Sequence, residues 1–259
     1  MKKLMKSAIA LAAIGGAMHA HATLVIDKFN VGKAAGDQFV ASEGSIEYST
    51  SDLTTNANIL GGQRDIIIER TISGGTGTRV SALVNTTSNL FTFSQDTLTA
   101  GYSILRYDGA LTTATDAIDT GGLGTVCVSC EAVGFLFQFG SDSPFPNPSV
   151  NDPFAIKIEV WGAGGAAFNS FTEIVPGTGG ASNLQPGFVL LNEAAWTNPG
   201  FDWSDVSALQ ITFNSGSPRA VEVDFAFTAP EGAVPEPGSI ALAGLALLGV
   251  AAARRRKAR

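Results

Sequence analysis

The chain has 259 residues, of which 16 are Lys or Arg and 23 are Asp or Glu, for a formal net charge of −7. This acidic balance argues against nucleic acid as a partner, because neutralising phosphates requires a basic surface. Both histidines, His19 and His21, lie within the first 22 residues. The rest of the chain therefore excludes a Ser-His-Asp triad, a Cys-His pair and every His-ligated metal site.

The N-terminus has the order of a secretory signal peptide over residues 1–22. Three lysines precede an apolar run at 7–17, and Ala20-His21-Ala22 forms an A-x-A cleavage site at Ala20 and Ala22. We expect the mature chain to begin at Thr23. Export makes the Sec machinery a partner, and it excludes chemistry that needs cytoplasmic cofactors such as ATP or NAD.

Basic residues at the two ends of the chain offset part of the negative charge of its central part. Residues 23–237 contain eight Lys or Arg against 23 Asp or Glu, a formal charge of −15. This charge indicates a solvated extracellular surface, and it is also compatible with calcium.

Alternation of apolar and polar residues dominates residues 23–230 and predicts half-buried strands. Two continuous apolar runs, 65–69 and 188–191, predict strands deep in the core. Pairs of glycines separate many of these segments and mark turns. The alternating segments are 24–29, 79–84, 90–94, 132–139, 154–161, 208–213 and 220–227.

Many short strands with Gly and Pro turns predict an all-β fold, an antiparallel β-sandwich, as one domain over residues 23–230. We interpret the proline-rich stretch Pro144–Pro148 as a long loop between strands. Short helical turns are predicted only at Ser51–Asn56 and Asp202–Val206.

Cys127 and Cys130 are the only cysteines in the chain. A zinc site is excluded because no further Cys or His is available as a ligand. After export, a disulfide that closes a turn between strands is the natural state, and a free or redox-active thiol pair is the alternative.

Candidate ligand residues are few. Trp161, Trp196 and Trp203, with Tyr48, Tyr102 and Tyr107, are the side chains that could stack on sugars. Among them, Trp196, which precedes Asn198-Pro199-Gly200, is the best candidate for an exposed ring, and packing in the core is the alternative.

Parts of this body resemble the jelly-roll sandwiches of carbohydrate-binding modules. The resemblance rests on the strand 24–29, on the segment 201–213, and on the following strand with Asp224. The stretch 59–66 also looks like a turn of other exported β-proteins. Because jelly rolls often bind calcium where their terminal strands meet, the resemblance suggests Asp27 and Asp224 as metal ligands, with calcium as the one cofactor considered.

The C-terminal segment 231–259 has three parts. Pro235, Glu236 and Pro237 form an extended motif, since each proline fixes its backbone and ends a preceding strand. The apolar stretch that follows, about 239–253, predicts a short transmembrane helix. Residues 254–259 form a basic tail, which should stay on the cytoplasmic side of the inner membrane.

These three parts, in this order, resemble the PEP-CTERM sorting signal of Gram-negative bacteria. The resemblance implies that an exosortase recognises the segment and removes it after transient insertion in the inner membrane. It also implies a location at the cell surface or in the extracellular matrix, alongside exopolysaccharide and biofilm. An uncleaved single-pass anchor is the alternative.

Three functions remain open for the body. The first is a non-catalytic surface or matrix protein. The second is a carbohydrate-binding module, which an exposed row of tryptophans would favour. The third is a polysaccharide hydrolase or lyase that uses carboxylates, which two carboxylates about 5–10 Å apart in a groove would favour.

Overall fold

The computed structural model describes most of the body of the chain. The described residues are 24–31, 38–41, 46–50, 58–72, 75, 78–96, 98–109, 117–141, 155–174, 178, 180–214, 223–228 and 231–233. The expected signal peptide with Ala20 and Ala22, the turn at 51–56, the loop at 144–148, and the sorting segment from residue 234 onward lie outside these ranges.

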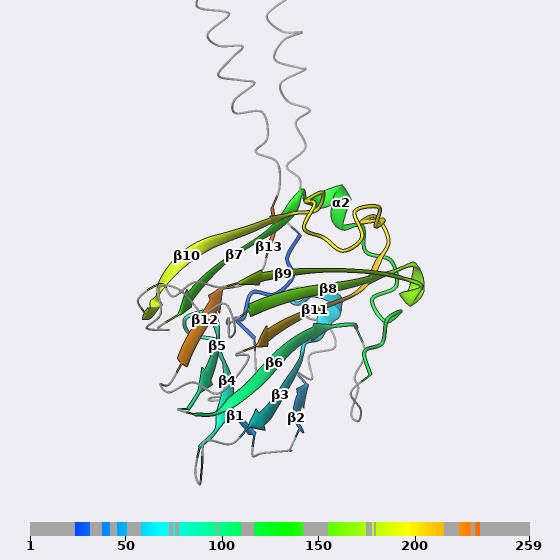
Figure 1. The fold of residues 1–259 in the computed structure, drawn as a ribbon. Coiled ribbons are helices and arrows are strands. Elements are labelled where there is room, and N and C mark those ends of the chain that lie inside the picture. Colours follow the sequence, from blue (N-terminus) through cyan, green and yellow to red (C-terminus); the bar gives the residue numbers. More distant parts are fainter. Residues whose placement is uncertain are drawn as a thin grey trace, which may run out of the picture.

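The strands form two antiparallel sheets, which confirms the predicted all-β sandwich (Figure 1). The first sheet has the order β1-β4-β5-β12-β7-β10, and β13 also pairs with β7. Its strands are β1 (Gln38–Ala41), β4 (Val80–Asn85), β5 (Leu90–Gln95), β12 (Val223–Thr228), β7 (Gly134–Ser141), β10 (Gly180–Leu190) and β13 (Glu231–Ala233).

The second sheet has the order β2-β3-β6-β11-β8-β9. Its strands are β2 (Ile46–Thr50), β3 (Asp65–Ile72), β6 (Ala100–Tyr107), β11 (Val206–Asn214), β8 (Ala155–Gly162) and β9 (Ala167–Ile174). Helical structure in the described residues is limited to α2 (Val128–Glu131) and two 3-10 turns, η1 (Leu60–Gly62) and η2 (Ala163–Gly165). No helix in these ranges is long and apolar enough to cross a membrane.

The core lies between the sheets and is rich in phenylalanine. Burial alternates residue by residue along β5 and β8, as the period of two predicted. Phe91 on β5 stacks on Phe213 of β11 with ring centroids 4.9 Å apart, and Phe213 meets Phe227 of β12 at 5.1 Å. Because these rings come from both sheets, they hold the two layers together.

Two predicted elements have a different secondary structure from the one expected. The segment 24–29 is no regular strand: it makes an isolated bridge at Asp27, and the Asp27 carboxylate accepts the backbone N–H of Phe29, whose φ is 49°. This local turn interrupts the ladder. Residues 202–206 form a turn that leads into β11 rather than a helical turn, because Asp202 Oδ1 accepts both the N–H and the hydroxyl of Ser204.

The continuous apolar pattern of 188–191 predicted a strand deep in the core. The structure contradicts this prediction. The first three residues of this run belong to β10, which lies at the edge of the first sheet. Val189 and Leu191 are buried, whereas Phe188 is 48% exposed and Leu190 is 40% exposed. An edge strand covered on one face thus carries apolar residues on both faces.

Candidate functional site

The tryptophan chosen as an exposed platform is part of the core. Trp196 is only 3% exposed, which agrees with the alternative of core packing rather than with a sugar-stacking surface. Its indole packs against Phe135, Phe171 and Trp203, and Nε1–H donates to the carbonyl of Leu190 at 2.7 Å. Both the ring and its one polar group are therefore engaged inside the protein.

The other tryptophans also pack against protein rings. Trp203 is buried and meets Phe201 and Trp196 edge to face at 4.9 Å and 4.8 Å between centroids. Trp161 on β8 is half-buried and lies 5.2 Å from Phe168 of β9. The described residues therefore contain no exposed row of tryptophans on a sheet face.

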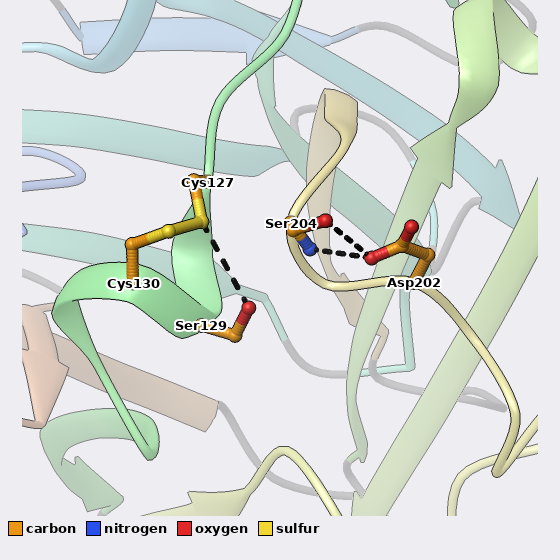
Figure 2. Close-up of a disulfide and its surroundings, with 5 residues drawn as sticks. All are labelled: Cys127, Ser129, Cys130, Asp202 and Ser204. Carbon is orange, nitrogen blue, oxygen red and sulfur yellow. Dashed lines mark hydrogen bonds between the residues drawn. A yellow bond between two sulfur atoms is a disulfide. The ribbon is translucent and has the colours of Figure 1, made fainter.

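Cys127 and Cys130 form a disulfide across α2, beside the turn at Asp202 and Ser204 (Figure 2). The backbone N–H of Ser129 donates to the carbonyl of Trp203 at 3.1 Å, which ties α2 to this turn. The hydrogen bonds from Ser204 lower the pKa of the Asp202 carboxyl. Since the disulfide closes a loop of very few residues, it adds about 2 kcal/mol at most to the free energy of unfolding.

Asp27 lies at the centre of a buried polar cluster. Its Oδ2 accepts a hydrogen bond from Arg64 Nη1 at 2.6 Å and one from the Tyr107 hydroxyl at 3.1 Å. Its Oδ1 accepts the N–H of Phe29 at 2.8 Å. Arg64 Nη2 donates to the carbonyl of Val31 at 2.8 Å, and the guanidinium lies 5.5 Å from the centroid of the Phe29 ring.

Burial dominates the electrostatics of this cluster. Burial raises the pKa of Asp27, although Arg64 and the N–H of Phe29 act to lower it. Burial and the neighbouring Asp27 carboxylate raise the pKa of Tyr107 well above its ordinary value. Tyr107 therefore stays neutral and serves as a hydrogen-bond donor.

This geometry gives Asp27 a partner other than the suggested calcium ion. Arg64 neutralises its carboxylate, and both carboxylate oxygens accept hydrogen bonds from protein donors. Asp224 lies on β12, paired with Ser94 of β5. Within the described part of the chain, no three Asp, Glu, Cys or His side chains gather as a metal site would need.

Arg64 is the central residue that sequence reasoning missed. It follows Gly61-Gly62-Gln63, in the stretch that resembles a turn of exported β-proteins. One signal was present, because an arginine next to an apolar strand needs an acidic partner if it is buried. The partner lies 37 positions away and could not be chosen from the sequence.

One surface groove of about 450 Å³ is rich in polar side chains. It lies between the N-terminal segment, the turn joining β4 to β5, and the outer face of β7 and β12, and we call it the polar groove. None of its residues is acidic. Its lining is Lys28, Asn30, Ser88, Asn89, Leu136, Phe137, Gln138 and Thr228.

The polar groove is suited to hydroxyl-rich ligands, and Lys28 is the one charged side chain in its lining. Asn30, Asn89 and Gln138 are exposed, and each carboxamide can both donate and accept hydrogen bonds. Leu136 is 42% exposed and adds an apolar surface. The Phe137 ring is buried and offers no stacking platform.

Solved structures that match this chain include two modules from Clostridium thermocellum. The family 11 carbohydrate-binding module of the cellulosomal cellulase Lic26A-Cel5E is 12% identical, with a TM-score of 0.38, over 84% of this chain and 97% of the module. The family 30 module of Cel9D-Cel44B is 14% identical, with a TM-score of 0.33, over 77% of this chain and 98% of the module. An agarase, AgWH50C, is 12% identical, with a TM-score of 0.34, over 64% of this chain and 23% of the agarase.

The similarity to these modules is too low to assign this chain a ligand or a role. No curated protein matches the sequence. A family model does match the end of the chain: residues 233–257 fit the PEP-CTERM protein-sorting motif. The chain therefore carries the sorting signal of an exported, exosortase-targeted protein.

Proposed function

We propose that this protein is a non-catalytic component of the cell surface or extracellular matrix of a Gram-negative bacterium, associated with exopolysaccharide and biofilm. The observation that carries the proposal is the match of residues 233–257 to the PEP-CTERM sorting motif. In this proposal, Sec exports the chain through the signal peptide at 1–22. An exosortase then processes the tail at Pro235-Glu236-Pro237 after transient insertion in the inner membrane.

The described part of the body supports a scaffold rather than a processing role. Its aromatic side chains are largely used in the core between the sheets, and the residues lining the polar groove include no carboxylate. Carboxylate-based hydrolysis would need an acid and a second carboxylate flanking the substrate. A stacking-type binding module would need a row of exposed aromatic rings. Trp196 and Trp203 are buried, and the exposed rings of Phe188 and Phe168 lie on different sheets.

The sorting part of the proposal is tested by the intact mass of the protein recovered from its native host. We expect a species that begins at Thr23 and ends close to Pro235–Pro237, with or without added glycan, in the surface or matrix fraction. Replacing Pro235 and Pro237 by alanine should leave the chain full length in the inner membrane. A wild-type chain that extends through Arg259 in the inner membrane would instead establish a permanent anchor.

The polar groove is where we expect polysaccharide to bind. Native gels containing exopolysaccharide extracted from the host should retard the mature protein. Asn89→Ala and Gln138→Ala should each weaken binding about fivefold, since one lost hydrogen bond is worth about 1 kcal/mol. The matched control is Asn192→Ala, an exposed amide outside the groove, which should bind as wild type does. Retardation that is absent, or equal in all variants, would contradict the role of the groove.

A further inference from the structure

Exposed apolar side chains gather at one place on the described surface. Six large apolar residues in the described ranges are strongly exposed, and four of them lie at the meeting of β7 and β10. We call these four the apolar patch. They are Phe188 at 48%, Leu136 at 42%, and Val133 and Leu190 at 40% each.

The register places three of the four patch residues on the outer face of the first sheet. Phe188 lies directly opposite Leu136 in the antiparallel pair, so their side chains share a face, and Leu190 follows two positions later on that face. Gly134 leaves room for the Phe188 ring, because a Cβ there would lie 3.0 Å from ring carbons of Phe188. Val133 precedes β7, and its carbonyl accepts the N–H of Leu191.

An apolar hollow of about 560 Å³ adjoins the patch. Val133 and Leu190 belong to both, and the hollow continues over Ala132 and Pro199 to Trp203. Patch and hollow together form a larger apolar surface than single exposed residues do, and such surfaces mark contacts with apolar partners.

The sorting tail leaves the sandwich at the edge of this patch. Strand β13 pairs with the start of β7, with Glu231 opposite Leu136 and Ala233 opposite Gly134 (Figure 1). Residues 234–239 then connect Ala233 to the apolar stretch that begins at Ile240. At about 3.3–3.6 Å per residue, this connection reaches at most about 25 Å.

We propose that the apolar patch rests on the lipid surface of the membrane that holds the sorting tail. While the tail is inserted, its short connection keeps the patch close to the headgroups. Contact with the lipid then costs little further translational or rotational entropy. The acidic body disfavours attraction to anionic lipid, so apolar contact drives the docking. Docking would hold the Pro235–Pro237 motif at the membrane surface in one orientation.

The patch is covered by lipid rather than by the tail's own apolar stretch. Ile240–Ala253 is expected to lie within the bilayer during sorting and is then unable to cover a face of the sandwich. Of the proposed function, the inference uses only the sorting signal. It stands whether or not the polar groove binds polysaccharide.

The test uses the full chain in phosphatidylcholine vesicles, with a fluorescent dye on one introduced cysteine. Asn192→Cys places the dye beside the hollow, and Thr71→Cys places it on β3, far from β13 (Figure 1). The described residues contain no free cysteine that would compete for the dye. Quenching by lipids with a nitroxide at the headgroup should be about threefold stronger at position 192 than at 71, because interfacial apolar faces lie about 5–10 Å into the headgroup region.

A matched pair of variants separates docking from the mere presence of the tail. Leu136→Ser with Phe188→Ser should lower quenching at position 192 to the level at 71. Leu98→Ser, at a residue that is 50% exposed outside the patch, should change nothing. Added salt should leave the wild-type signal intact.

Three results would overturn the proposal. Equal quenching at the two dye positions shows that the body does not dock. A Leu136→Ser, Phe188→Ser variant with wild-type quenching shows that the patch is not the contact. A dye at position 192 that is shielded from both nitroxide lipid and an aqueous quencher shows that protein, such as the tail itself, covers the patch.

Discussion

Replacing Asp27 by alanine is expected to lower the free energy of unfolding by about 3–5 kcal/mol, because the change leaves Arg64 buried without its counter-charge. Arg64 is only 2% exposed. The N–H of Phe29 and the Tyr107 hydroxyl lose their acceptor in the same variant. Arg64→Met should cost a similar amount, since Asp27 would then be the isolated buried charge.

Removing both charges together should lower the free energy of unfolding less than removing either one. In Asp27→Asn with Arg64→Met, the asparagine Oδ1 can still accept from Phe29, and its Nδ2–H can donate to the Tyr107 hydroxyl oxygen. No ion then remains to be desolvated. Buried ion pairs exchanged for neutral groups of similar volume are often close to neutral in stability. We therefore expect the double variant to recover more than half of the single-variant loss.

Urea denaturation of the mature protein measures these differences, with the slope m used to check that the unfolded surface is unchanged. The matched control is the surface pair Lys157–Glu159, whose charged atoms are 2.7 Å apart while the Lys157 side chain is 43% exposed. Lys157→Met should change stability by less than about 1 kcal/mol. A loss after Asp27→Ala no larger than that of the control would contradict the role given to the buried pair.

This ion pair attaches the N-terminal segment to the sandwich. Asp27 lies shortly after the expected start of the mature chain at Thr23, and Arg64 lies just before β3. Through Asp27, Phe29 and Val31, the first described segment is fixed to the sandwich without forming a full strand. A chain that remains attached to its signal peptide would carry that peptide close to this buried cluster.

The fold could be predicted because its strands show a period of two. Segments such as 90–94 and 154–161 alternate in sequence and alternate in burial. The failures occurred where a long-range partner decides the outcome. The pairing of Asp27 with Arg64 joins residues 37 positions apart. Strand β10 lies at the edge of its sheet because β7 is its one neighbour in the strand order.

The polar groove and the apolar patch could not be predicted for the same reason. Lys28, Asn89 and Gln138 come from three separate parts of the chain, and no local pattern links them. The apolar residues of 188–191 suggested burial, because hydropathy does not report whether a neighbouring sheet covers both faces. The sorting motif needed no such information, since its three parts are contiguous in sequence.

Trp196→Ala is expected to lower the free energy of unfolding by about 3–5 kcal/mol, the usual range for deleting a buried large aromatic side chain. The indole is shared by Phe135, Phe171 and Trp203, so its loss leaves a cavity bounded by three rings. Trp196→Phe keeps most of that packing but loses the Nε1–H bond to Leu190, and should cost about 1–2 kcal/mol. Trp161→Phe, at a half-buried position, should cost less than either.

The same variants decide between a core role and a ligand role for Trp196. If the ring is a core element, Trp196→Phe should be retarded by exopolysaccharide as strongly as wild type, because the ring is 3% exposed and lies outside the polar groove. Urea denaturation should then show the stability loss while binding is preserved. A Trp196→Phe protein with full stability but weakened retardation would show that this tryptophan contributes to polysaccharide binding. The comparison therefore separates packing from recognition at Trp196.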